Sequence, residues 1–317
     1  MSLNETLGTS YALVFPGQGS QYVGMAKELA ESSGIARETI EHADARLGFP
    51  LSELMFEGPE ETLNDTFNSQ PAIFTASVAA LRALHARADD EGYVLAPMMV
   101  AGHSLGEFTA LVAAEVIDFE TGLDLVRARG RAMMEAGAAN PGAMAAVLGM
   151  DDERIAELVD EASQGDVITI ANLNCPGQTV VSGAVEPLER FVELAKSAGA
   201  RRVARLPISI ASHSALMEPA AATLNTLFDD IVLNQPTMPL VSNSTGQRLN
   251  TAEEIREELR YHVVRGVDWT TSIRTMIEAG ITTFVEIGPG NVLAGLNKRI
   301  DKSVSTLSLK DLDLPSA

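Results

Sequence analysis

A serine set between two glycines is the residue of this chain best suited to covalent chemistry. Ser104 lies in the sequence Gly-His-Ser-Leu-Gly at 102–106, which fits Gly-x-Ser-x-Gly. The apolar run 98–101 precedes it and the helix-like run 107–114 follows it. A tight turn between strand and helix exposes such a serine, and glycines avoid the clashes that side chains would cause there. The context therefore predicts a serine nucleophile, although the five residues alone also suit an ordinary strand-to-helix loop.

A serine nucleophile needs a base within hydrogen-bond reach. His42 and His85 lie in polar helical stretches and are typical of surface residues. His103 adjoins Ser104, but successive side chains at a strand end point to opposite faces, so we expect a structural role. His213 lies in a loop that follows a predicted strand and is the best-placed base, although most lone loop histidines are solvated. The remaining histidine is His262.

A second glycine-containing loop, Phe-Pro-Gly-Gln-Gly-Ser-Gln at 15–21, follows a short apolar run. It fails the dinucleotide-binding pattern because Tyr22 occupies the third glycine position, and it lacks the Lys-Ser or Lys-Thr pair of a phosphate loop. The alternative is a loop whose backbone N–H donates into an oxyanion hole. Glu107 occupies the lysine position of a Ser-x-x-Lys motif, which argues against a penicillin-binding type of site.

Composition excludes several other classes of protein. The 317 residues are 46% hydrophobic and carry a net charge of −20, which allows a sizeable core and disfavours nucleic-acid binding. A single cysteine, Cys175, excludes an internal disulfide and a cysteine-based zinc cluster. No apolar run approaches the roughly 18 residues that span a membrane. Residues 1–10 lack the features of a signal peptide, so we expect a cytoplasmic protein.

Apolar runs typical of strands alternate with helical patterns, which predicts an α/β fold with a mostly parallel sheet covered by helices. We expect strands at 11–15, 98–101, 239–242 and 283–287, and helices at 72–86, 123–136 and 290–300.

One block has its own order of elements: strand 143–149, helix 151–162, strands 167–171 and 179–182, helix 186–198 and strand 202–206. This order is the ferredoxin-like pattern. We therefore expect a ferredoxin-like small domain at 138–206, inserted into a large hydrolase-like α/β domain formed by 1–137 and 207–317.

Six motifs occur in order along the chain: the loop at 15–21, Gly-His-Ser-Leu-Gly-Glu at 102–107, Arg129-Gly130-Arg131 with Met133, Asn-Cys-Pro-Gly-Gln at 174–178, Ser212-His213, and Glu-Ile-Gly-Pro-Gly at 286–290. With these motifs the sequence resembles the malonyl-CoA:acyl carrier protein transacylases of fatty-acid synthesis and the related acyltransferases of polyketide synthases. The resemblance covers about 11–300 and agrees with the two-part architecture.

The resemblance implies a role for each site residue. Ser104 would carry malonyl as an ester, and His213 would accept its proton and return it to the CoA thiolate. The backbone N–H groups of Gln18 and Leu105 would form the oxyanion hole. Arg129 would hold the free malonyl carboxylate with its planar fork and so exclude acetyl groups. Without the resemblance, a surface arginine on an amphipathic helix is the simpler interpretation of Arg129.

The resemblance also implies three residues that line the acyl pocket: Met133, Asn174 and Ser212. A backbone carbonyl, usually of a glutamine, orients the catalytic histidine in this family, and His262 occupies that position here. Gly266 replaces the proline of the family's Pro-Val-x-Trp segment, whose tryptophan, Trp269, we expect to be a core anchor. No metal ion or cofactor is implied.

We therefore expect transfer of malonyl from malonyl-CoA to the phosphopantetheine thiol of an acyl carrier protein in fatty-acid synthesis. A polyketide acyltransferase using malonyl or methylmalonyl is an alternative, since Ser212 before His213 suits both. A serine esterase or thioesterase is a further alternative, but the chain lacks an HGGG-type loop. A non-catalytic carrier-binding protein is a third. We expect neither a nucleic-acid nor a membrane partner.

Acyl carrier proteins are acidic, and so is this chain, so their docking requires a local basic patch. The densest cluster of basic residues precedes His213 and consists of Lys196, Arg201, Arg202 and Arg205. We expect the three arginines to help to dock the carrier, although a solvated strand end explains them equally well.

Overall fold

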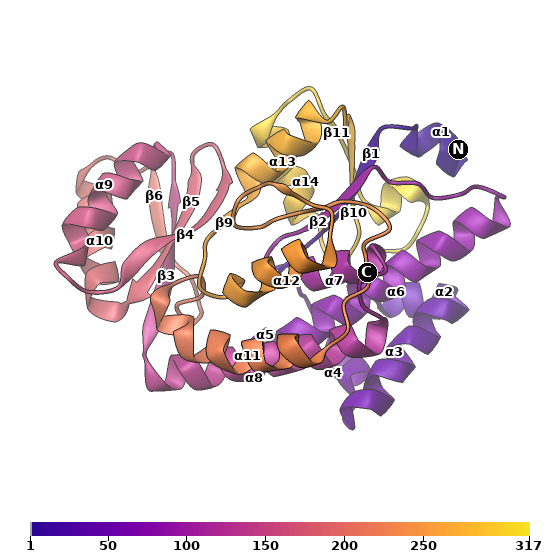
Figure 1. The fold of residues 1–317 in the computed structure, drawn as a ribbon, viewed down its shortest axis with the longest axis horizontal. Helices are drawn as coiled ribbons and strands as arrows, with labels where there is room; N and C mark the ends of the chain where they lie inside the picture. Colours follow the sequence, from indigo (N-terminus) through magenta and orange to yellow (C-terminus); the bar gives the residue numbers. More distant parts are fainter. Residues whose placement is uncertain (1) are drawn as a thin grey trace.

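The computed structural model describes residues 2–317, and its strands form two sheets (Figure 1). The larger sheet has the strand order β11-β10-β1-β2-β7-β8, and β7–β8 is its only antiparallel pair among the registered pairs of the described chain. The mostly parallel sheet predicted from the sequence is confirmed. Its strands are β1 (Tyr11–Phe15), β2 (Met99–Gly102), β7 (Leu240–Val241), β8 (Arg248–Leu249), β10 (Thr283–Glu286) and β11 (Ser305–Leu307).

Helices cover both faces of the larger sheet, which is why its central strands are unbroken apolar runs. Leu13 and Phe15 of β1 belong to the core formed with the helices of the N-terminal half. Ala12 and Val14, which alternate with them, belong to a second core that includes Trp269.

The two long helices predicted at 72–86 and 123–136 are present, and both extend further in the structure. Each begins at an aspartate cap: Asp65 accepts a hydrogen bond from the N–H of Phe67, and Asp118 from that of Thr121. Within residues 2–317, no helix combines the length and apolar composition needed to cross a membrane. The α-helices are α1 (Leu3–Leu7), α2 (Lys27–Ser32), α3 (Gly34–Leu47), α4 (Leu51–Glu57), α5 (Glu60–Asn64), α6 (Thr66–Asp90), α7 (Gly106–Ala113), α8 (Phe119–Ala139), α9 (Asp152–Ser163), α10 (Val185–Ser197), α11 (Glu218–Asp230), α12 (Ala252–Tyr261), α13 (Trp269–Glu278) and α14 (Val292–Ile300), with 3-10 turns at Ala215–Met217 and Leu309–Leu312.

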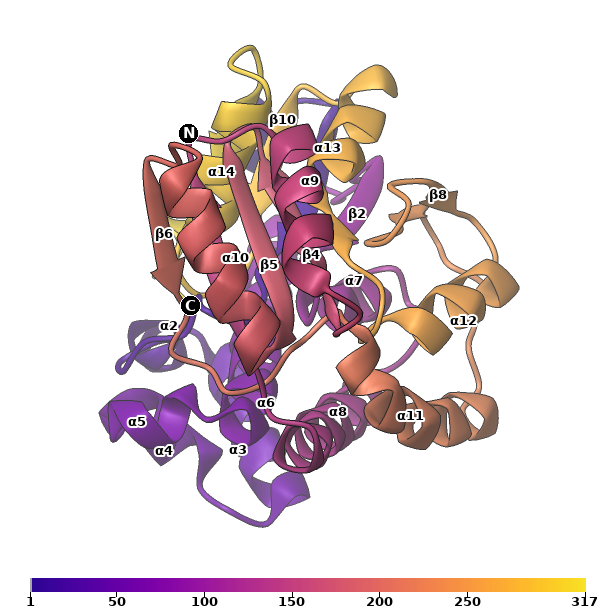
Figure 2. The ribbon, with the colours of Figure 1, turned by 90° about the vertical axis from the view of Figure 1, so that its left-hand side faces the viewer.

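The smaller sheet has the order β6-β3-β5-β4-β9, and its first four strands pair antiparallel. With α9 and α10 they follow the predicted order of strand, helix, two strands, helix and strand, so the ferredoxin-like arrangement is confirmed. Figure 2 shows both helices on the outer side of this sheet. Its strands are β3 (Gly142–Leu148), β4 (Ile168–Cys175), β5 (Gln178–Ala184), β6 (Arg202–Arg205) and β9 (Val267–Asp268).

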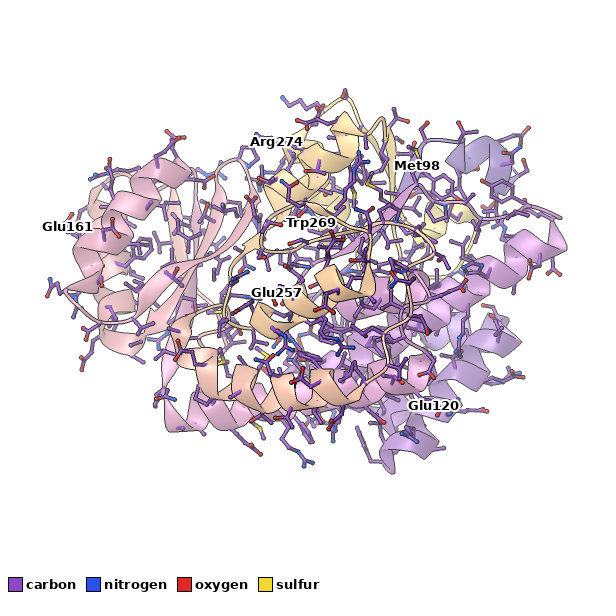
Figure 3. All side chains as sticks on the ribbon, in the orientation of Figure 1. Met98, Glu120, Glu161, Glu257, Trp269 and Arg274 are labelled. Atoms are coloured by element: carbon purple, nitrogen blue, oxygen red, sulfur yellow. The ribbon has the colours of Figure 1, made fainter. Side chains whose placement is uncertain are left out.

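A short strand from the C-terminal part of the chain joins the smaller sheet. β9 pairs parallel with β4, and α13 begins immediately after it at Trp269. Trp269 is 1% exposed and its indole N–H donates to Asn297 Oδ1 at 2.9 Å, as expected of a core anchor (labelled in Figure 3). Sequence patterns missed β9 because two residues carry no periodicity. The domain boundary at 138–206 stays a prediction.

Candidate active site

Ser104 lies on a strained turn between β2 and α7. Its φ is +50°, a left-handed conformation that side chains other than glycine rarely adopt. The glycines on either side are required by close backbone contacts. A Cβ on Gly102 would lie 1.9 Å from the carbonyl carbon of Gly106, and a Cβ on Gly106 would lie 2.1 Å from the oxygen of Phe15. The turn therefore exists only with glycine at both positions.

His213 is the residue that the structure places beside the serine oxygen. Its Nε2 lies 2.9 Å from Ser104 Oγ, and its Nδ1 lies 2.8 Å from the carbonyl oxygen of Arg265. Because a carbonyl only accepts, Nδ1 carries the proton and Nε2 is free to accept one from the serine. Burial, reinforced by the charge of Arg129, lowers the pKa of His213 to about 3. The imidazole is therefore neutral and able to act as a base.

The carbonyl that orients His213 is not the one expected from the sequence. That prediction named His262, whereas the hydrogen bond goes to Arg265. The reason is local: α12 ends before His262, and the chain then turns so that 263–265 runs along His213. The N–H of His213 donates to Val263 O at 2.9 Å, which brings the carbonyl two residues further on to the ring.

Two backbone N–H groups are available for an oxyanion near Ser104. Neither Gln18 N nor Leu105 N donates to another group of the described chain. Gln18 follows β1, and Leu105 precedes the first residue of α7. The N–H of His103 donates to Phe15 O at 2.9 Å, which brings the two loops together. By contrast, the N–H of Ser104 is already bonded to Asn243 Oδ1 at 2.8 Å.

Arg129 projects from α8 to the same serine. Its Nη2 lies 3.0 Å from Ser104 Oγ, and its side chain is almost fully buried at 2% exposure. This excludes the surface arginine considered from sequence alone. Burial lowers the pKa of Arg129 to about 10, against the opposing influence of Glu107, so the group remains charged at neutral pH. A buried positive charge thus contacts the oxygen of the candidate nucleophile.

Sequence reasoning predicted no side-chain role for two buried residues near Arg129, His262 and Glu107. His262 Nδ1 accepts from Arg129 Nε at 3.3 Å, and its Nε2 lies 3.0 Å from Ser104 O and 2.9 Å from Glu107 Oε2. Burial and the nearby Glu258 raise the pKa of Glu107 well above its usual value. Burial, with the charge of Arg129, holds the pKa of His262 well below its usual value. A signal was present, since Glu107 is an acidic residue opening an otherwise apolar helix.

Asn174 belongs to β4 of the smaller sheet, and its side chain reaches the turn at 102–106 that carries Ser104, here called the elbow. Its Oδ1 lies 2.8 Å from His103 Nε2, and the His103 ring packs 5.5 Å from that of Trp269. His103 is therefore a link between the two sheets, in line with the structural role expected of it. A cavity of about 150 Å³ opens here, lined by residues that include Gln18, His103, Asn174 and Val292.

The remaining pocket residues differ in their surroundings. Met133 is buried, and its sulfur lies 3.5 Å from Nε2 of Gln70. Gln70 is fully buried and its Oε1 has no hydrogen-bond partner within the described chain. Sequence reasoning missed Gln70, although a glutamine beside Pro71 in an apolar helix was a signal. Ser212 is half-buried next to His213 and makes no side-chain hydrogen bond within residues 2–317.

In the part of the chain that the structure describes, no three His, Cys, Asp or Glu side chains are grouped to hold a metal ion. A larger cavity of about 370 Å³ lies elsewhere, between α6 and the end of α7. The geometry at Ser104, with a neutral imidazole and a buried cation both at its oxygen, suits acyl transfer through serine.

Comparisons with known proteins show similarities that extend over nearly the whole chain. Residues 12–310 match the family described as acyl transferase domain. The malonyl CoA-acyl carrier protein transacylase of Escherichia coli (strain K12) is 45% identical over 309 residues, covering 98% of this chain and 97% of that protein. The namesake of Bacillus subtilis (strain 168) is 42% identical over 301 residues, covering 95% of this chain and 93% of that protein.

Solved structures give the same result. An acyl carrier protein S-malonyltransferase from Vibrio cholerae O1 biovar eltor str. N16961 superposes with a TM-score of 0.91 at 40% identity, covering 96% of this chain and 99% of that one. A malonyl-transacylase in complex with its type II PKS acyl-carrier protein gives a TM-score of 0.90 at 41% identity, covering 95% and 96%.

Proposed function

Because the chain belongs to the acyl transferase domain family, we propose that it transfers a malonyl group from malonyl-CoA to the phosphopantetheine thiol of an acyl carrier protein. One observation carries the proposal. The hydroxyl of Ser104 lies between a neutral base, His213 Nε2 at 2.9 Å, and a buried cation, Arg129 Nη2 at 3.0 Å. The first contact makes the serine a nucleophile, and the second selects an acyl group that ends in a carboxylate.

The first half-reaction loads the enzyme. His213 Nε2 takes the proton of Ser104 as Oγ attacks the thioester carbonyl of malonyl-CoA. The negative charge on the tetrahedral intermediate is held by the N–H groups of Gln18 and Leu105, and one such donor contributes roughly 3–4 kcal/mol to the barrier reduction. The intermediate collapses, the C–S bond breaks, and His213 gives its proton to the CoA thiolate.

The second half-reaction runs the same steps with the carrier thiol. His213 removes the thiol proton, the thiolate attacks the Ser104 ester, and the serine oxygen leaves and regains the proton. Each proton that His213 accepts is returned within the same half-reaction, so no metal ion or cofactor is required.

Arg129 gives the acyl pocket its preference. The carboxylate of malonyl is separated from the reacting carbonyl by a single CH₂ group, so a cation 3.0 Å from Ser104 Oγ is close enough to hold it. Charge-assisted hydrogen bonds contribute about 1.5–3 kcal/mol each. An acetyl group would bring no counter-charge to the buried guanidinium, whose loss of hydration the substrate would then leave uncompensated.

The carrier is proposed to dock on the edge of the smaller sheet. Arg201, Arg202 and Arg205 are exposed at β6, which forms that edge (Figure 2). Arg205 lies 3.6 Å from Glu189, whereas Arg201 and Arg202 have no acidic partner among the described residues. Two uncompensated cations on a strongly acidic protein would attract an acidic carrier.

We place the reaction in fatty-acid biosynthesis in the cytoplasm, with Ser104 as the acyl-carrying residue. The support is the similarity over nearly the whole chain to malonyl CoA-acyl carrier protein transacylases. A polyketide carrier is the second candidate, favoured by the similarity to the malonyl-transacylase solved with a type II PKS carrier. Transfer assays with the carrier of each pathway distinguish the two.

Mass spectrometry after mixing with malonyl-CoA tests the function. A malonyl adduct is expected on Ser104 of the wild-type protein and absent from Ser104→Ala, and it should pass to holo carrier protein on addition. Release of free malonate without transfer would instead indicate a thioesterase. An adduct that persists in Ser104→Ala would contradict the assignment of the nucleophile.

A further inference from the structure

His262 is a buried imidazole that the reaction steps above do not use. The residue is 5% exposed, and its Nδ1 lies 3.3 Å from Nε of Arg129. The guanidinium of arginine has donors only, so Nδ1 must present its lone pair and the ring proton must be on Nε2. His262 is therefore fixed as the Nε2–H tautomer by its partner.

The other side of the ring faces a matching acceptor, the carbonyl oxygen of Ser104. Nε2 lies 3.0 Å from the carbonyl oxygen of Ser104 and 2.9 Å from Oε2 of Glu107. The charged or titratable side chains facing the ring are Arg129, Glu107 and His213, whose ring centroid is 6.4 Å away. A second proton on His262 would point at the N–H of Arg129, so the ring stays neutral.

The contact at Nε determines how the guanidinium is presented. The Nε–H bond lies in the guanidinium plane, so an acceptor fixed at Nε fixes the orientation of that plane. Nη2 of Arg129 is then held at Ser104 Oγ, while Nη1 makes no hydrogen bond within the described chain. A planar fork binds a carboxylate well only when the two planes are aligned.

We propose that His262 is a positioning residue for Arg129: by accepting its Nε–H, it orients the guanidinium toward the carboxylate of the incoming acyl group. This inference rests on the proposed function, because it needs a substrate carboxylate for Arg129 to bind. It assigns His262 no contact with substrate. The residue acts through Arg129 alone, and so it affects only acyl groups that carry a carboxylate.

Single-turnover acylation of Ser104 by malonyl-CoA and by acetyl-CoA separates this role from a general structural one. His262→Leu removes the acceptor, and we expect malonyl acylation to slow on the order of 10- to 100-fold, because small misplacements of a clamping group have effects of that size. Acetyl acylation, which does not use Arg129, should change less than about 3-fold. His262→Asn is the matched control, since its Oδ1 can replace Nδ1 as acceptor and should restore much of the malonyl preference.

A double-mutant cycle makes the test stricter. In an Arg129→Ala background, His262→Leu should cause less than about a 2-fold further change with malonyl-CoA, because residues that act through one contact are not additive. Equal losses with malonyl and acetyl, or additive losses in the cycle, would overturn the inference. A wild-type protein that forms no malonyl adduct would instead contradict the proposed function.

A spectroscopic measurement tests the arrangement without substrate or a destabilising substitution. In ¹⁵N-labelled wild-type protein, the His262 ring should show a protonated Nε2 and an unprotonated Nδ1. The signals are assigned by their absence in His262→Asn. A protonated Nδ1 would rule out the contact with Arg129 and overturn the inference, whether or not the enzyme uses malonyl-CoA.

Discussion

Arg129 Nη2 lies 3.0 Å from Oγ of Ser104, although Arg129 is in α8 and Ser104, 25 positions earlier, is in the turn between β2 and α7. Under the proposed function, this contact places a buried positive charge at the atom that would carry the acyl group. It explains how one serine site can prefer a dicarboxylic acyl group over a neutral one, and it leads to the first prediction.

Replacing Arg129 should invert acyl selectivity. In Arg129→Ala, we expect kcat/KM for malonyl-CoA to fall about 100-fold or more, because two charge-assisted hydrogen bonds are lost. Acylation by acetyl-CoA should be unchanged or faster, since no buried cation is left without a partner. Arg129→Lys should fall between the two, as an ammonium lacks the planar fork. Equal losses with both substrates would show that Arg129 supports the fold rather than the choice of substrate.

The rate of acylation should not fall near pH 6.5, where an ordinary histidine base becomes protonated. The pKa of His213 is lowered to about 3, below its ordinary value of 6.5, so the neutral base persists as the pH falls. The profile of kcat/KM for malonyl-CoA, which reports the free enzyme, should therefore be flat between pH 5 and 8. A decline with a midpoint near 6.5 would show that His213 is more solvated than the structure has it.

The free energy of unfolding at acidic pH provides a second measure of the burial of His213. Below pH 6.5 the unfolded chain protonates His213, whereas the folded protein does not until about pH 3. Unfolding then takes up a proton, so His213 lowers the free energy of unfolding by up to about 1.4 kcal/mol for each pH unit below 6.5. We expect His213→Gln to lose less stability than wild type between pH 6.5 and 5. Chemical denaturation at both pH values checks this, and identical losses would refute it.

An amide should be tolerated in place of the Glu107 carboxyl. Burial raises the pKa of Glu107 well above its usual value, which favours the uncharged form that an amide imitates. Glu107→Gln should therefore keep malonyl acylation within about 5-fold of wild type, while Glu107→Ala should lose stability by roughly 1–3 kcal/mol because it empties the space of a buried side chain. A large loss of activity in Glu107→Gln would mean that the carboxylate is ionised.

The glycines of the elbow should resist substitution. The Cβ of Gly102→Ala would lie 1.9 Å from backbone, so we expect destabilisation above about 2–3 kcal/mol or a protein that fails to fold. Gly295→Ala in α14 is the control, because a Cβ there meets nothing within 4 Å and alanine favours a helix by about 1 kcal/mol. Thermal unfolding distinguishes the two, and similar melting temperatures would contradict the tight elbow.

The KM for carrier protein tests whether the arginines at β6 dock the carrier. Arg201→Ala with Arg202→Ala should raise the KM for carrier protein several-fold and leave that for malonyl-CoA unchanged, with the effect shrinking at high salt. Arg154→Ala is the matched control, since that arginine is exposed on α9 and paired with Glu157. An unchanged carrier KM in the double variant would exclude this docking surface.

The fold was predictable to the extent that local pattern determines it. The strand at 11–15 has the predicted bounds, and the ferredoxin-like order of elements in 142–205 follows from its alternating periodicities. Helix α12 was missed because its apolar positions are few beside its charged ones, and α3 was indicated only as a polar helical stretch around His42. The two-residue strand β9 was unpredictable, since its pairing with β4 depends on a contact distant in sequence.

The candidate site also has parts that the sequence indicated and parts that only the tertiary structure decided. By itself the sequence determined the elbow, because the glycines around Ser104 answer a local steric demand, and by resemblance it indicated His213 and Arg129 as partners. Only the tertiary structure decided that the carbonyl of Arg265, rather than that of His262, orients His213, and that the side chain of His262 instead lies against Arg129. The physical reason is that a backbone turn after α12 sets which group faces the site, and such a turn depends on packing among segments more than 100 residues apart.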